Sequence, residues 1–272
     1  MRRSTPRTAA WGGLVSLTLC LAPLLGDSKS SLILPFPPDT GRVPAVTFDT
    51  RGRAIGQSEF AFEARDESHF LMRVDMRIEG GAQNRTHAEL ERIAQVGDEP
   101  PRLRLLIEQS QSFEADGTPM TLLRVDHVTG LASCTPPEGS SDAAVVLALP
   151  ADDRVANVPM NLLFLPIARG EVERIRFQLF VCRGGARFYK FVAFAGPRSH
   201  GGKSQIIEVR YGPDLGKLMS WVASRVMPKL SFWFDTNRNG AYVAHRMPIY
   251  SRGPEIVMIR EGVEPPELGT PF

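Results

Sequence analysis

The sequence predicts a mainly β protein, a large antiparallel meander that forms a curved half-barrel sheet with one covering amphipathic α-helix. Three observations support this fold class. Apolar and polar residues alternate in many segments, turn signals recur at short intervals, and glycine (24) and proline (22) are frequent. Alternation with a period of two is typical of strands that bury one face, and frequent turns leave room for few long helices.

The first 26 residues predict a secretory signal peptide. Arg2, Arg3 and Arg7 precede an apolar stretch over 9–25, and the first acidic residue is Asp27. This stretch contains Gly and Pro and is shorter than the ~20 apolar residues that a membrane-spanning helix needs. We therefore expect export to the periplasm of a Gram-negative bacterium. An outer-membrane lipoprotein anchored at Cys20 and an uncleaved anchor are the alternatives.

Removal of the signal leaves a chain that is close to neutral. Residues 1–26 contain three arginines and no acidic residue, so the 32 basic and 30 acidic residues become 29 and 30. The basic residues are dispersed, without a run of five, so we expect no nucleic-acid partner. No second apolar run reaches membrane-spanning length, so membrane contact is expected to be peripheral.

The mature chain divides into a proline-rich extended lead over 27–42, a single β-rich domain over 43–262 and a C-terminal tail over 263–272. Strands are expected near 44–49, 53–64, 69–78, 82–93, 102–113, 120–128, 172–182, 187–195 and 204–211, with a hairpin and one further strand over 230–260. The range 135–170 predicts an irregular connection, with a loop, a short strand and a proline-interrupted apolar segment.

One segment, 213–227, predicts a helix. Leu215, Leu218, Met219, Val222 and Val226 fall on one helical stripe, with Pro213 near its start and Pro228 after its end. This stripe is expected to cover the sheet.

The apolar faces of the strands, with Trp221 at the rim of this helix, form the candidate surface for an apolar ligand. A weaker alternation places Leu103, Leu105 and Ile107 on one face of another strand. The candidate ligand-binding residues are Phe70, Met72, Val74, Met76, Ile175, Phe177, Leu179 and Trp221.

Cys134 and Cys182 are the two cysteines that remain after removal of the signal. An even pair in an oxidising compartment can form a disulfide. Such a bond would close a loop of about fifty residues and stabilise the fold by about 3–4 kcal/mol. Two buried free thiols are the alternative.

No motif indicates a metal, a cofactor or a catalytic residue. Residues 235–240 match the first six positions of a calcium loop, but Arg246 stands where the loop needs a bidentate Glu. A hairpin turn at Asn239 and Gly240 explains the segment better. The histidines lack metal-ligand spacing, and no nucleophile motif occurs. Paired catalytic carboxylates leave no spacing in a sequence, so a hydrolase stays open.

Three segments, 51–64, 107–120 and 230–259, resemble an uncharacterised family of bacterial exported β-rich proteins. The motif residues are two glycines near the first strand and an aromatic hairpin near the end: Gly52, Gly56, Trp233, Phe234, Asp235, Pro248 and Gly253. That family resembles the open, half-rolled sheet of lipoprotein-carrier proteins. The resemblance implies an apolar concave face that holds acyl chains, with the helix 213–227 across it. It assigns no catalytic residue.

These inferences favour a non-enzymatic exported envelope protein whose curved sheet binds a lipid, another apolar ligand or an envelope partner. The main rival is a closed core that leaves no pocket. A periplasmic hydrolase would bring two carboxylates together in a cleft. A structural or assembly factor of the envelope would expose an apolar patch or an unpaired sheet edge.

Overall fold

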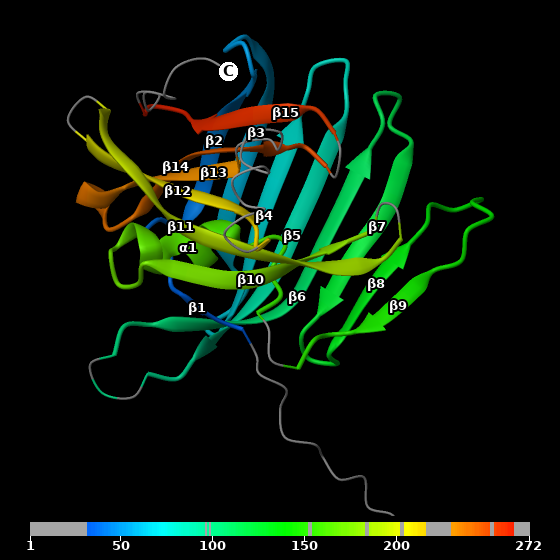
Figure 1. The fold of residues 1–272 in the computed structure, drawn as a ribbon, viewed down its shortest axis with the longest axis horizontal. Helices are drawn as coiled ribbons and strands as arrows, with labels where there is room; N and C mark the ends of the chain where they lie inside the picture. Colours follow the sequence, from blue (N-terminus) through cyan, green and yellow to red (C-terminus); the bar gives the residue numbers. More distant parts are fainter. Residues whose placement is uncertain are drawn as a thin grey trace, which may run out of the picture.

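The computed structural model describes residues 32–95, 97, 99–151, 154–182, 185–201, 204–215, 230–250 and 253–263. These residues form a 15-stranded sheet, one α-helix, α1 (Met160–Ala168), and one short 3-10 helix, η1 (Thr236–Arg238) (Figure 1). The strands are β1 (Ile33–Pro35), β2 (Gly41–Asp49), β3 (Ala54–Ala64), β4 (His69–Arg77), β5 (Gln83–Ile93), β6 (Arg102–Phe113), β7 (Pro119–Asp126), β8 (Leu131–Thr135), β9 (Val145–Ala148), β10 (Arg174–Val181), β11 (Arg187–Gly201), β12 (Ser204–Pro213), β13 (Leu230–Asp235), β14 (Ala241–Pro248) and β15 (Glu255–Arg260).

The sheet consists of two meanders joined edge to edge. Strands β2 to β9 follow one another across one part, strands β10 to β15 across the other, and β15 pairs with β2. The ends of the sheet are therefore β9 and β10, and short β1 adds to β6. The open, curved antiparallel sheet confirms the predicted fold class. It also confirms the strand prediction for 82–93, which β5 occupies.

Alternating apolar residues form the concave face. Along β3 and β4 the buried residues lie opposite one another, as Phe60 with Val74 and Phe62 with Met72. Burial of such a pair on one face stabilises the fold by about 25 cal/mol per Å² of apolar area, while the other face keeps its charges in water. Glu63 on that other face pairs with Arg42 and Arg73.

Helix α1 lies inside the rolled sheet, behind β10 and β11 in Figure 1. Its sequence, MNLLFLPIA, is apolar on every side, and all of its residues except Pro166 are buried. A helix that is apolar all round must be surrounded by protein. Phe164 contacts Phe177 of β10 and Phe232 of β13, with ring centroids 5.5 and 5.4 Å apart. The helix is thus the central plug of the core.

The prediction of an irregular connection over 135–170 therefore needs correction at 160–168. A short helix with Pro166 inside it and no polar face lacks the amphipathic stripe that identifies a surface helix. The same range also holds the predicted short strand, which is β9. It begins with Thr135, the last residue of β8, a strand that the sequence did not predict. The predicted helix over 213–227 lies outside the described residues from 216 onward, and Leu215 is exposed.

The two ends of the sheet overlap. Side chains on the concave face of β7 and β8 pack against the back of β10, in a cluster that includes Val125, Ala132, Cys134 and Phe180. We call this cluster the seam. Residues 154–157 cover the free edge of β10, because Gln178 exchanges backbone hydrogen bonds with Arg154 and Ala156. The sheet is therefore rolled up rather than closed by strand pairing.

Candidate functional site

Two small cavities lie beside α1 on the concave face of the sheet. The larger is about 50 Å³ and the smaller about 20 Å³. Phe60, Asn161 and Tyr242 line both, so these three side chains separate one cavity from the other. A buried water needs roughly 10–15 Å³ of such space, so this state has room for a few waters.

His245 on β14 gives the larger cavity its most unusual polar group. The residue is 4% exposed, and its Nε2 atom has no hydrogen-bond partner among the described residues. The other ring nitrogen, Nδ1, is 2.8 Å from the hydroxyl of Tyr242. A buried polar atom without a partner costs about 1–3 kcal/mol, so this atom needs an explanation.

The neighbours of His245 fix its proton. Burial lowers the pKa of His245 to about 4, so the ring is neutral at pH 7. Burial also raises the pKa of Tyr242, whose hydroxyl therefore stays protonated. The alternative acceptor for that hydroxyl, the Met258 carbonyl, is 3.5 Å away, so Tyr242 donates to Nδ1. The proton of the neutral ring is then on Nε2, which is an unused donor.

The rest of this cavity is mostly apolar. Its wall includes Phe60, Val74, Met76, Met160, Phe232 and Met247. Thr86 also lines it, but its hydroxyl donates to the Val74 carbonyl at 3.2 Å and is satisfied. The cavity therefore offers the Nε2 donor of His245, with the Asn161 amide as a further polar group, in mostly apolar surroundings. An apolar ligand with an oxygen acceptor matches this combination.

The smaller cavity lies under the segment that connects β1 to β2. Pro37, Pro38 and Asp39 line it, as does Arg260 of β15. The carboxylate of Asp39 accepts a hydrogen bond from Nη1 of Arg260, and another from Nη2 of Arg238 at 2.9 Å. A charged cluster thus stands at one end of an apolar interior.

The predicted apolar face divides between cavity and packed core. Val74 and Met76 line the larger cavity. The other described residues of the predicted face lie in the main core: Phe70, Met72, Ile175 and Phe177, with Leu179 at its edge. Phe70 contacts Phe36 and Phe62 there. Phe177 contacts Phe164. Trp221 lies outside the described residues.

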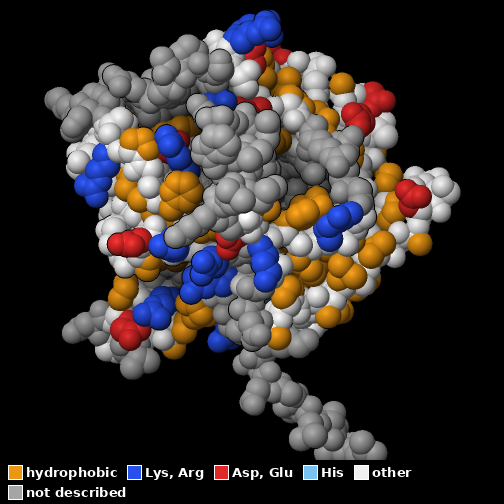
Figure 2. Space-filling view, viewed as in Figure 1, with side chains coloured by type: hydrophobic (Ala, Val, Ile, Leu, Met, Phe, Trp, Pro, Cys, Tyr) orange, Lys and Arg blue, Asp and Glu red, His pale blue; other side chains and the backbone are white. Residues whose placement is uncertain are grey.

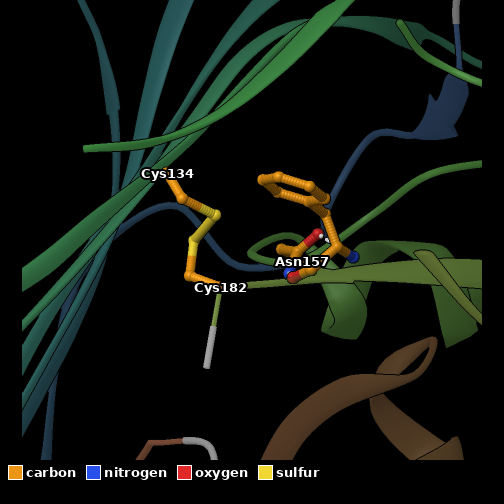
Figure 3. The surroundings of a disulfide bond; sticks show 4 residues. Cys134, Asn157 and Cys182 are labelled. Carbon is orange, nitrogen blue, oxygen red and sulfur yellow. Dashed lines mark hydrogen bonds between the residues drawn. A yellow bond between two sulfur atoms is a disulfide. The ribbon is translucent and has the colours of Figure 1, made fainter. Parts of the chain in front are cut away.

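Cys134 and Cys182 form the predicted disulfide, which excludes two free thiols (Figure 3). Their Cα atoms are 5.5 Å apart. Cys134 lies on β8 and Cys182 directly follows β10, so the bond joins the two overlapping ends of the sheet. Asn157 lies beside it, where its side chain donates to the Phe180 carbonyl at 2.7 Å and accepts from the Phe180 amide at 3.1 Å.

Glu108 on β6 is a fully buried carboxylate that sequence reasoning missed. Its Oε2 accepts hydrogen bonds from the backbone amides of Asn157 at 2.6 Å and Val158 at 2.7 Å. Its Oε1 accepts from Nε2 of His127 at 2.9 Å. The carboxylate thereby anchors the chain just before α1. The sequence pattern placed Ile107 on the apolar face, but a bulge opposite Glu89 and Leu90 turns Glu108 inward instead.

The described residues contain no group of three or more metal-ligating side chains. Asp235 of the calcium-like segment caps η1, since it accepts from the Asn237 amide at 3.0 Å and from the Ser204 hydroxyl at 2.8 Å. Antiparallel β13 and β14 flank η1, which confirms the predicted hairpin turn. Within the part of the chain that the structure describes, no helix has the length and apolar character to cross a membrane.

Comparisons with known proteins show a likeness to solved structures. No family model matches the sequence, and no curated protein matches it. Among solved structures, the chain is similar to a β-barrel-like protein of domain of unknown function DUF1849 from Brucella abortus. The match has 12% sequence identity and a TM-score of 0.39, and it covers 86% of this chain and 99% of that chain. The site itself therefore carries the functional argument.

Proposed function

We propose that the chain is a non-enzymatic, exported envelope protein that binds a slender apolar ligand, such as a single acyl chain with an oxygen acceptor, inside the rolled sheet. The observation that carries this proposal is the unpaired Nε2 donor of His245 in a cavity with mostly apolar walls. A ligand oxygen there would satisfy the donor, while the chain of the ligand contacts the apolar wall.

The charges around the cavities favour binding over hydrolysis. Among the described residues that line the two cavities, Asp39 is the one carboxylate, and two arginines hold it. A pair of catalytic carboxylates, as a glycosidase-like hydrolase needs, is not formed there. The disulfide supports export, because such bonds persist in oxidising compartments such as the periplasm.

Ligand binding requires the interior to open, because the cavities of this state hold only water-sized molecules. The lining of the smaller cavity includes Pro37 and Pro38 from the segment before β2, and Leu162 and Leu165 from α1. Parting these two segments would open the smaller cavity, and a shift of Phe60, Asn161 or Tyr242, which line both cavities, would join the two into one path. Burial of an acyl chain contributes about 0.8 kcal/mol per methylene, enough over ten carbons to offset local rearrangement.

Calorimetric titration of the full exported chain with decanol tests this proposal, with decane as the ligand that lacks an acceptor. H245L removes the donor and should weaken decanol binding by about three- to tenfold while decane binding stays unchanged. H87L is the matched control, because His87 lies on β5 and lines neither cavity. T86L narrows the cavity and should weaken the binding of both decanol and decane. Absence of decanol binding by the wild type, or unchanged binding by both H245L and T86L, would contradict the proposal.

A role in envelope structure is the second candidate, and the end of the sheet at β9 favours it. Val145 and Val146 are exposed by 41% and 57%, and apolar side chains gather at this side of the molecule (Figure 2). Residues 143–149 carry no charge. Two copies of β9 paired antiparallel would therefore bring no like charges together. Sedimentation velocity should then show a dimer that V146K dissociates, and a monomeric wild type would exclude this role.

A further inference from the structure

Among the residues that the structure describes, two arginines and one carboxylate meet at the mouth of the smaller cavity. Arg260 follows Ile256 and Met258 on the concave face of β15, and its side chain is 18% exposed. An arginine at an inward-facing strand position is rare unless it has a partner. Two arginines, Arg238 and Arg260, share the single carboxylate of Asp39.

The segment that carries Asp39 runs between two anchored points. Phe36 anchors its start, with ring centroids 5.5 Å from Phe62 and 5.3 Å from Phe70. Gly41 ends it with φ of 90°, a conformation that residues with a side chain rarely adopt. Residues 37–40 between these points belong to no strand or helix. They cross the smaller cavity as a strap, and Asp39 is the acidic residue of this strap.

We propose that Arg260, assisted by Arg238, binds the anionic headgroup of the ligand, a carboxylate or a phosphate ester, and that Asp39 occupies this place in the empty protein. This inference rests on the proposed function, because it adds the class of headgroup to a ligand whose chain lies beside α1. The ligand is then an acidic amphiphile whose charged group lies at the mouth, and a second oxygen along its chain, in the larger cavity, accepts from Nε2 of His245.

The chemistry of the cluster suits such an exchange. A guanidinium group presents several N–H donors in a planar fork that matches the two oxygens of a carboxylate or phosphate. Asp39 uses one terminal nitrogen of each arginine, Nη1 of Arg260 and Nη2 of Arg238. An incoming headgroup can replace these bonds one for one. The side chain of Asp39 is 26% exposed, so its carboxylate regains water when it leaves the two arginines.

A third cation stands close to the mouth. Nε of Arg169, at the end of α1, donates to the Asn239 carbonyl at 3.2 Å, next to Gly240, which lines the smaller cavity. Glu171 lies 3.8 Å from Nη1 of Arg169 and balances it. Within the described part of the chain, the excess positive charge therefore belongs to the pair Arg238 and Arg260, and it is this pair that attracts an anion.

Titration of the full exported chain with three probes tests the inference. Decanoate carries both charge and chain, decanol carries the chain with an uncharged oxygen acceptor, and inorganic phosphate carries the charge alone. D39N removes the internal competitor and should raise the affinity for decanoate by about three- to tenfold, with decanol unchanged. R260Q should lower decanoate affinity by about tenfold or more, and R260K should retain part of it. D214N is the matched control, because Asp214 pairs with Arg176 away from both cavities.

The outcomes separate this inference from the proposed function. If decanol binds but decanoate binds no better, and D39N and R260Q change neither, the headgroup assignment is wrong while the proposed function stands. If neither amphiphile binds the wild type, the proposed function is wrong, and the headgroup assignment, which depends on it, is wrong as well. If phosphate binds as tightly as decanoate, the arginine pair binds a free anion, and the proposal of an amphiphilic ligand is wrong. Circular dichroism establishes folding of each variant, and the contrast of R260K with wild type carries the test if R260Q does not fold.

Discussion

Glu108 and His245 are both buried inside the rolled sheet, one next to the seam and the other beside α1, and their hydrogen bonding differs. The carboxylate of Glu108 accepts three hydrogen bonds, from two backbone amides and His127. His245 uses one ring nitrogen for Tyr242, while its Nε2 has no partner among the described residues.

The difference separates a structural group from a candidate binding group. A buried polar group whose partners are all within the fold holds those partners in one arrangement. A buried donor without a partner lowers stability by about 1–3 kcal/mol, and a ligand that accepts from it recovers that loss. The side of the molecule near the seam therefore fixes the roll, and the side beside α1 is the one available for a ligand.

Removal of the Glu108 carboxylate should give the largest loss of stability. E108A leaves two amides and His127 unpaired and should lower the free energy of unfolding by about 3–5 kcal/mol. E108Q keeps an acceptor for the amides and should cost roughly half as much. Denaturant unfolding followed by circular dichroism measures both, with E89A on the exposed face of β5 as the control. A loss no greater than that of E89A would show that Glu108 anchors nothing.

Loss of the disulfide should be the next largest effect. The pair of substitutions C134A and C182A frees a loop with a sequence separation of 48 residues. The free energy of unfolding should fall by about 2–4 kcal/mol, mainly because the unfolded chain gains conformational freedom. Decanol binding should persist in the folded protein, since neither cysteine lines a cavity. If decanol binding disappears while the variant stays folded, the two regions do not act separately.

A smaller, pH-dependent effect should come from His245. Its pKa is about 4 in the folded protein and about 6.5 in an unfolded chain, so the unfolded state binds a proton first as the pH falls. Stability contributed by the neutral ring is complete above about pH 6.5 and is lost toward pH 4, by about 2 kcal/mol at pH 5.

H245L should therefore flatten the dependence of unfolding free energy on pH between these values. Burial also lowers the pKa of His87, so H87L is the matched control and should remove only its own part of the slope. Parallel pH profiles for wild type and H245L would show that His245 is not buried as a neutral ring.

The sequence was sufficient for the strands with regular alternation. Phe70, Met72, Val74 and Met76 point to one face of β4, as their spacing of two predicts. The disulfide prediction for Cys134 and Cys182, which are the two cysteines outside the predicted signal segment, is confirmed. The Asn239 and Gly240 turn was predictable because both residues tolerate positive φ, and they adopt values of 54° and 80°.

The polar residues Tyr242, His245 and Glu108 escaped sequence reasoning because two β-bulges change the faces. Tyr242 and His245 are three residues apart, a spacing that places them on opposite faces of a regular strand. An irregular register between Trp233 and Phe234 makes Val243 the extra residue, so both side chains reach the interior. Leu106 has the same role in β6, where it turns Glu108 inward. A bulge of one residue leaves no composition signal of its own.

The sequence by itself determined the local features of this protein: strands with one apolar face, the turns between them and the candidate pair Cys134 and Cys182. Those features depend on neighbours within a few residues, so spacing reveals them. The tertiary structure decided how the sheet rolls, which apolar segment becomes the plug α1 and which polar groups face inward. These depend on contacts between residues far apart in the chain, such as Asp39 with Arg260 and Glu108 with Asn157, and on register shifts that only strand pairing fixes.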